Sequence, residues 1–79
     1  MDTIRAMQTF VRAVELGSLS AVAREQQASQ PTISKVVAAL EKQLGIRLLE
    51  RSTTSLSPTE AGRRFYERAR RVLEEFGEA

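Results

Sequence analysis

The sequence predicts a mostly α-helical domain, with a head of three helices, a short two-stranded wing and a long C-terminal helix. Three observations support this prediction. Apolar residues recur at helical spacing in four segments, and a glycine follows the first and the third of them. A run rich in hydroxyl side chains lies between two short extended stretches around Thr54. At 79 residues the chain has the size of one domain.

Composition removes most classes of function. The hydrophobic share of 42% and the charged share of 28% are ordinary for a globular protein. No apolar run approaches the roughly 18 residues of a membrane span, and the start of the chain lacks the pattern of an export signal, so we expect a cytoplasmic protein. The absence of cysteine and histidine excludes disulfides, the usual zinc and haem ligands and His-based triads.

Enzymatic catalysis is not expected. The remaining acids, hydroxyls and lysines show no nucleophile–base spacing, no phosphate-cradling glycine loop and no paired metal carboxylates. We therefore predict no cofactor, no metal site and no catalytic residue.

The first helix is predicted from about Thr3 to Glu15, and Gly17 ends it. Its apolar stripe consists of Ile4, Met7, Phe10, Val11 and Val14. Ser18 is expected to cap a short second helix. The inward residues of that helix are Leu19, Val22 and Ala23.

A third helix follows a turn at Gln27-Ala28 and ends at Gly45. It opens at Ser29 or at Gln30: Ser29 is the better cap, but a cap at Gln30 would place Pro31 at the first helical position. The predicted inward face consists of Ile33, Val36, Val37, Leu40 and Leu44. The opposite face holds Pro31, Lys35, Ala38 and Lys42.

Together the second and third helices predict a helix-turn-helix. A short turn before a helix whose first turn presents an amide, hydroxyls and a cation is typical of proteins that read the DNA major groove. Periodicity alone would also fit an ordinary core helix with a solvated back, but the turn and the polar first turn favour DNA binding.

The net charge is only +2, so the distribution of charge matters more than its sum. Cations in or beside the helix-turn-helix are Arg24, Lys35, Lys42, Arg47 and Arg51. Five further arginines of the C-terminal segment alternate with acids, which predicts a solvated helix face with ion pairs.

The stretches Ile46–Arg51 and Ser52–Leu56 predict two short extended segments around a hydroxyl-rich tip, a wing. Its contact candidates are Arg51, Ser52 and Thr53, because a cation beside such a tip can reach a phosphate or the minor groove. A simple hairpin that closes the core with leucines is an alternative that can hold at the same time.

The last helix is expected to start near Ser57–Glu60, with Ser57 and Glu60 as a capping box or Thr59 as the cap. A helix of about 20 residues would extend past the head and leave part of its apolar stripe exposed, so we expect it to pair with a second copy. The alternative is that the stripe folds back on the first helix. Candidate dimerisation residues are Phe65, Ala69, Val72, Leu73 and Phe76. The chain thus divides into residues 1–58 and a linker helix over 59–79.

A series of motifs then points to a family. These are Ala21-Val22-Ala23, Ser29-Gln30-Pro31-Thr32-Ile33-Ser34, Leu40-Glu41, Leu44-Gly45, Leu48-Leu49-Glu50-Arg51 and Thr59-Glu60-Ala61-Gly62. Over essentially its whole length the chain resembles the N-terminal domain of LysR-type transcriptional regulators. It departs from the family at Gln26, usually leucine, and at Ala28, usually a branched apolar residue.

The resemblance implies a winged helix-turn-helix dimer that pairs through antiparallel linker helices and binds an inverted-repeat operator with an A/T-rich core. The candidate DNA-binding residues are Ser29, Gln30, Pro31, Thr32, Ser34, Lys35, Lys42, Arg51, Ser52 and Thr53. Chemically, Gln30 can bond adenine N6 and N7, and Lys35 can reach guanine O6 and N7 or a phosphate. Many family members carry arginine where this chain has Lys35, so its base preference is expected to be softer.

Members of the family continue into a larger effector-binding domain, which is absent from this chain. We therefore expect part of a longer regulator, with no small-molecule effector site, that binds DNA without ligand control. The alternative function is a helical protein–protein interaction module, since the last helix alone would suit helix-in-groove binding. That alternative leaves the segment Ser29–Lys35 unexplained.

Overall fold

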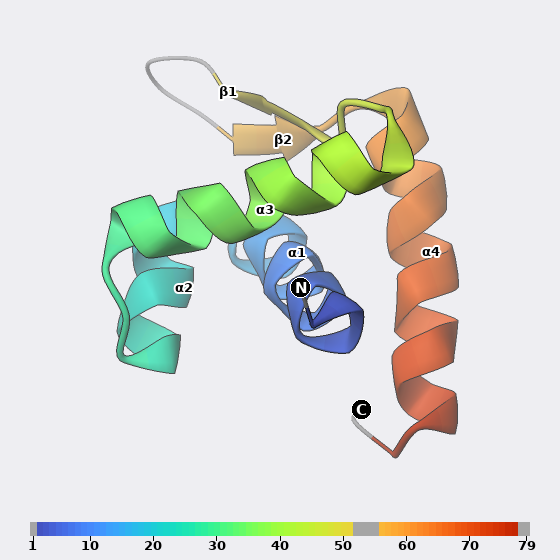
Figure 1. Ribbon diagram of the computed structural model, residues 1–79, viewed down its shortest axis with the longest axis horizontal. Coiled ribbons are helices and arrows are strands. Elements are labelled where there is room, and N and C mark those ends of the chain that lie inside the picture. The colour runs from blue at the N-terminus through green and yellow to red at the C-terminus, as the bar shows by residue number, and fades with distance from the viewer. Residues whose placement is uncertain (1, 52–55, 78–79) are drawn as a thin grey trace.

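The computed structural model describes residues 2–51 and 56–77 (Figure 1). Four helices and two strands follow one another as α1 (Thr3–Leu16), α2 (Leu19–Gln26), α3 (Gln30–Leu44), β1 (Leu49–Arg51), β2 (Leu56–Pro58) and α4 (Glu60–Glu75). The two strands form an antiparallel sheet. The predicted fold class, a winged helix-turn-helix followed by a further helix, is confirmed.

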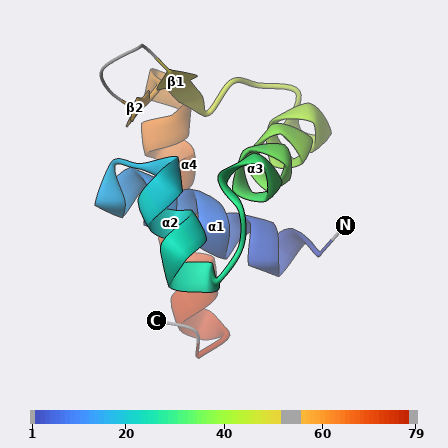
Figure 2. The same ribbon diagram turned by 90° about the vertical axis from the view of Figure 1, so that its left-hand side faces the viewer.

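Helix α1 is the centre of the fold. It lies between α2 and α4, and α3 crosses it (Figures 1 and 2). The Asp2 side chain caps it by accepting a hydrogen bond from the Arg5 amide at 3.1 Å, and Gly17 ends it at φ +66°, where glycine is favoured. The core around α1 consists of Ala6, Phe10, Val11, Ala13, Leu19, Val22, Ala23, Ile33, Val37, Leu40, Leu48, Leu49, Ala69 and Leu73.

The predicted turn of the helix-turn-helix is present. Ser18 caps the start of α2, which ends at Gln26. Gln27 follows as the C-cap and takes a left-handed conformation at φ 57°, although it is not glycine. A hydrogen bond of 2.8 Å from the Ala28 amide to the Ala23 carbonyl closes the turn. Gln26 donates to the hydroxyl of buried Thr9 at 3.2 Å, so this polar side chain has a partner where the family usually has leucine.

Helix α3 begins with Ser29 as its cap, because the Ser29 hydroxyl accepts a hydrogen bond from the Thr32 amide at 3.3 Å. This settles the alternative in favour of Ser29. Of the predicted inward residues, Ile33, Val37 and Leu40 are buried and Val36 is half-buried. The prediction for Leu44 is wrong. It is 39% exposed, since it is the last residue of α3 and lies beyond the crossing with α1.

The wing is tied to the end of α3 by one carboxylate. Glu41 Oε2 accepts hydrogen bonds from the amides of Leu48 at 2.8 Å and Leu49 at 3.2 Å. Both leucines are buried, so the segment also closes the core. The strands pair with Leu49 opposite Pro58 and Arg51 opposite Leu56. The wing tip predicted at Ser52 and Thr53 lies outside the described residues.

The start of α4 packs against the backbone of Leu48. Thr59 caps that helix by accepting a hydrogen bond from the Gly62 amide at 2.9 Å, and its own amide donates to the Leu48 carbonyl at 3.0 Å. The capping box predicted at Ser57 is wrong, because Ser57 is extended in β2 opposite Glu50. A Cβ atom added at Gly62 would overlap the Leu48 carbonyl oxygen and lie 2.9 Å from the carbonyl carbon.

Helix α4 folds back on α1, and at 16 residues it is shorter than predicted. Ala69 and Leu73 are buried in the protomer core, and the Phe65 ring contacts that of Phe10 at a centroid distance of 5.7 Å. Both side chains thus pack within the protomer, and their predicted role in dimerisation stays a prediction. Phe76 is 65% exposed.

A polar network holds α1, α2 and α4 together on the side of Arg12. The Arg12 guanidinium donates to Glu25 at 2.6 and 2.9 Å and to Glu15 at 2.7 Å, while the Tyr66 hydroxyl donates to Glu15 at 2.8 Å. The hydrogen bond from Tyr66 lowers the pKa of Glu15, and those from Arg12 lower the pKa of Glu25. Both carboxylates therefore stay ionised at neutral pH.

Replacing Gly62 by alanine is expected to destabilise the protein. Alanine is the better helix former by about 1 kcal/mol, but its methyl would overlap backbone, and overpacking typically costs about 1–3 kcal/mol. Urea unfolding followed by circular dichroism measures the difference. Arg63→Ala, at an exposed position of the same helix, is the matched control. A Gly62→Ala protein as stable as that control would contradict the close approach of Gly62 to the Leu48 backbone.

Replacing Glu41 by alanine is expected to loosen the wing from α3. Two amides lose a charged acceptor, and such hydrogen bonds contribute about 1.5–3 kcal/mol each when their partners are removed from water. The expected result is a lower free energy of unfolding together with faster amide exchange at Leu48 and Leu49. Glu50→Ala serves as control, because Glu50 is exposed on β1. Equal exchange rates in the two variants would refute the role of Glu41.

Candidate nucleic-acid interface

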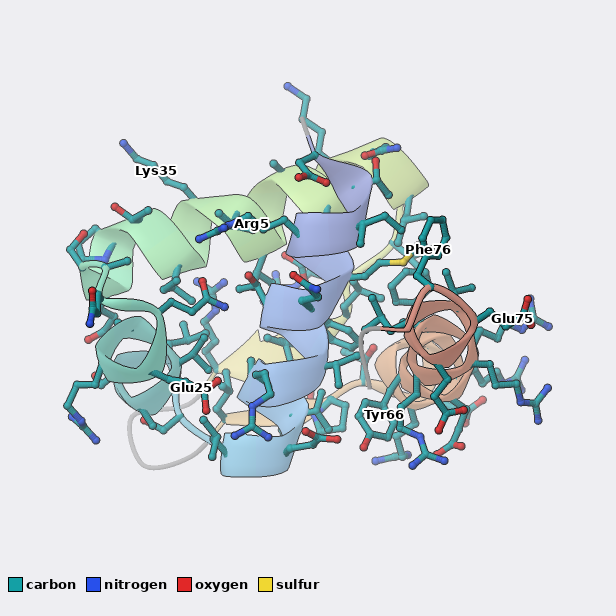
Figure 3. The ribbon with its side chains drawn as sticks, turned by 90° about the horizontal axis from the view of Figure 1, so that it is seen from below. Arg5, Glu25, Lys35, Tyr66, Glu75 and Phe76 are labelled. Atoms are coloured by element: carbon teal, nitrogen blue, oxygen red, sulfur yellow. The ribbon has the colours of Figure 1, made fainter. Side chains whose placement is uncertain are left out.

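The candidate side chains of α3 share one exposed face. Gln30, Pro31, Thr32, Lys35 and Lys42 are exposed, and Ser34 is half-buried at its edge. Lys35 projects away from α1 and the core (Figure 3). This face, together with Arg51 of β1, is called the recognition surface below. Of the candidate DNA-binding residues predicted from the sequence, only Ser52 and Thr53 lie outside the part of the chain that the structure describes.

The first turn of α3 is held in place by its own hydroxyls. Ser29 Oγ accepts from the Thr32 amide and shares a second hydrogen bond of 2.8 Å with Thr32 Oγ1. Ser29 thus acts first as the cap, and its contribution to the recognition surface is to fix the backbone from which Gln30 and Thr32 project. Pro31 restricts that turn further, since its ring fixes φ and it needs no amide partner at this position.

The wing strand and α3 meet through a side-chain contact. Arg51 Nη1 donates to Ser34 Oγ at 3.0 Å, although the two residues are 17 positions apart. Sequence patterns indicated both residues separately, and the structure brings them together. The guanidinium keeps further N–H donors that this single bond does not use, so it can bind a phosphate from the same position.

Two residues of the site were not identified from the sequence. Ser20, in the first turn of α2, donates from Oγ to Gln30 Oε1 at 2.8 Å. Arg5, exposed on the first turn of α1, points toward α3 and adds a cation beside the half of that helix that carries Lys35 (Figure 3). The position of Ser20 at the start of the helix before the turn is the one signal that could have found it, whereas Arg5 becomes a neighbour of α3 only through the crossing of α1 and α3.

Other kinds of site find less support in residues 2–51 and 56–77. There, no group of three or more acidic, histidine or cysteine side chains is placed to hold a metal ion. No helix in those ranges is long and apolar enough to cross a membrane. A cleft of about 490 Å³ between α1, α2 and α4 has Arg12, Glu15 and Glu25 among its lining residues. These three side chains pair with one another, and no residue of α3 or β1 lines the cleft.

Solved structures of similar fold include DNA complexes. The DNA-binding domain of CbnR in complex with DNA is 42% identical, with a TM-score of 0.90, and the match covers 98% of this chain and 87% of that one. The DNA-binding domain of BenM with benA site 1 DNA is 33% identical, with a TM-score of 0.90, over 99% of this chain and 86% of that one.

Similar sequences belong to longer regulators. The transcriptional activator AaeR of Escherichia coli K12 is 45% identical over 75 residues, which cover 95% of this chain and 24% of AaeR. This chain thus spans about a quarter of the length of such curated relatives. Residues 4–63 match the family model described as bacterial regulatory helix-turn-helix protein, lysR family. From this match and these relatives it follows that the chain belongs to the LysR family of bacterial helix-turn-helix regulators.

Proposed function

We propose that this chain binds double-stranded DNA with sequence preference, as the DNA-reading part of a bacterial transcription regulator in the cytoplasm, and that it catalyses no reaction. The observation that carries the proposal is the recognition surface itself. Its polar and cationic side chains project from one face of α3, and Arg51 is held beside them through Ser34. The CbnR and BenM domains of similar fold were solved with DNA, which supports this function.

Each part of the recognition surface has a distinct chemical task. In the major groove, Gln30 is placed to hydrogen-bond base edges, and the Pro31 ring and Thr32 methyl can contact a thymine methyl. Lys35 reaches a guanine edge or a phosphate. Lys42, two turns further along the exposed face of α3, and Arg51 bind phosphates, which positions the protein without reading sequence.

A protein-interaction module without DNA readout remains the second candidate, favoured only by the apolar part of α4. The two functions differ in their response to salt. Binding through lysine and arginine to phosphates weakens steeply as salt rises, whereas burial of an apolar helix face changes little.

The proposal includes pairing with a second copy through one side of α4, called its pairing side below. Residues on this side are half-buried or exposed in the protomer: Ala61, Phe65, Arg68, Val72 and Phe76. Near the start of α4, Ile46, Ala61 and Phe65 line a groove of about 300 Å³, and Ile46 is 42% exposed. An antiparallel second α4 would bring its Phe76 to this groove, since Phe76 lies at the opposite end of the helix.

Charge favours the same antiparallel arrangement. Arg64 and Arg68 border the groove near the start of α4, and Glu75 projects on the outer side near its end (Figure 3). Pairing the helices in opposite directions places acids of one copy opposite arginines of the other. A two-fold dimer in turn implies an operator with two inverted half-sites, and the A/T-rich core remains part of the proposal.

Gln30→Ala and Lys42→Ala should weaken DNA binding in different ways. Loss of Gln30 is expected to cost about 1–3 kcal/mol at one base pair of each half-site and little on random DNA. Loss of Lys42 should weaken all sequences alike and reduce the dependence of binding on salt. Fluorescence anisotropy with an A/T-rich inverted repeat and a scrambled duplex, at two salt concentrations, measures both.

The wild-type chain provides the test of the function itself. Salt-sensitive binding to DNA supports the proposal, and the absence of binding to either duplex at low salt by a folded protein would favour the interaction module. If the two variants lost affinity equally on both duplexes, the division between base reading and phosphate binding would be wrong.

Phe76→Asp is expected to convert a dimer into monomers, because the change removes the aromatic ring from the groove and sets a carboxylate against Ile46, Ala61 and Phe65 of the second copy. Phe76 is 65% exposed, so the fold of each protomer should survive. Sedimentation equilibrium gives the mass, and thermal unfolding confirms folding. Arg63→Asp introduces the same side chain on the other side of α4 and should leave the dimer intact. A Phe76→Asp protein that is still dimeric would place the contact elsewhere.

A further inference from the structure

The hydrogen bond between Ser20 and Gln30 connects the two helices of the helix-turn-helix at one end. The chain runs down α2 and returns, so that α3 starts beside the beginning of α2 (Figure 1). There the Ser20 hydroxyl donates to Gln30 Oε1 at 2.8 Å. Ser20 is half-buried, while Gln30 is exposed on the recognition surface.

This bond determines which end of the Gln30 amide faces outward. The amide carries an acceptor, Oε1, on one side of its carbon and two N–H donors, on Nε2, on the other. An exposed glutamine without a partner rotates freely about its last torsion and presents either end. With Oε1 anchored to Ser20, the N–H donors of Nε2 are the end presented to a ligand.

We infer that Ser20 is a positioning residue that sets the base preference of Gln30. By holding Oε1, it directs the Nε2 donors to base edges that carry acceptors in the major groove, namely purine N7, guanine O6 and thymine O4. Cytosine is disfavoured, because the group that it offers there is the N4 donor. The inference rests on the proposed DNA binding and names a residue that controls its specificity.

The bond is compatible with base contact. It leaves both N–H donors of Nε2 unused, so they can donate to purine N7, guanine O6 or thymine O4 while Oε1 stays bonded to Ser20. The backbone at Gln30 is fixed separately by the Ser29 cap on Thr32. Loss of the Ser20 hydroxyl therefore frees the Gln30 side chain and leaves the first turn of α3 in place.

A purely structural role for Ser20 makes a different prediction. If the bond only fastened α2 to α3, its loss would lower the free energy of unfolding and weaken binding to every sequence by the same factor. If it sequestered Gln30 from DNA, its loss would strengthen binding. Only a positioning role changes the preference among bases at a single position.

The experiment selects binding sites from a library of random duplexes with the whole chain, comparing wild type, Gln30→Ala, Ser20→Ala and Ser20→Thr. Gln30→Ala identifies the position that Gln30 reads as the one where preference disappears. Ser20→Ala is expected to admit cytosine at that position. The depletion of cytosine among the selected sites should fall about 2- to 10-fold, which corresponds to the net free energy of one hydrogen bond. Ser20→Thr keeps a hydroxyl and should keep the wild-type preference. Thermal unfolding shows that each variant is folded.

Several results would overturn the inference while DNA binding stands. These are an unchanged base profile in Ser20→Ala, a Ser20→Thr profile that matches Ser20→Ala, a loss of affinity equal for all sequences, or a Gln30→Ala profile equal to wild type. Failure of the wild-type chain to enrich any sequence or to bind the library at low salt would instead overturn the proposed function, and the role of Ser20 with it.

Discussion

The backbone of Leu48 is fixed from two sides, and the geometry of the recognition surface depends on it. From α3, the Glu41 carboxylate holds the Leu48 amide at 2.8 Å. From α4, the Thr59 amide donates to the Leu48 carbonyl at 3.0 Å, and Gly62 lies so close that a side chain would overlap that oxygen. The short link between α3 and the wing is thereby held against both helices, in a region where buried amides need partners.

Fixing this link determines where the wing stands relative to α3. Strand β1 begins at Leu49, directly after Leu48. It positions Arg51 so that Nη1 of its guanidinium lies 3.0 Å from Ser34 Oγ. At the other end of α3, the Ser29 cap holds the first turn, and the hydrogen bond from Ser20 holds the Gln30 side chain. Side chains from α2, α3 and β1 thus form one surface, and α1 supports it from within the core. Binding then requires little ordering of these groups, which lowers its entropic cost.

Local patterns predicted the elements, whereas contacts between distant residues could not be predicted. Helical periodicity and Gly45 located α3 and its end, since both depend on neighbours along the chain. Ser57 and Thr59 are equally good caps in sequence, and strand pairing decided between them. The apolar stripe of α4 is broad, and the sequence does not show which of its edges packs on α1. Only the structure shows that Leu73 is on the buried edge. The contact of Ser20 with Gln30 exists only because the turn reverses the chain.

The most direct test of the account follows backbone amide signals of the ¹⁵N-labelled chain by NMR during titration with a duplex that it binds. The recognition surface predicts that the largest shifts fall on the first turn of α3 and on Arg51, with smaller ones at the far end of α3 and near Arg5. Signals of the Arg12 network between α1, α2 and α4 should stay in place. Shifts concentrated on that network or on the pairing side of α4, with the first turn of α3 unchanged, would contradict the account.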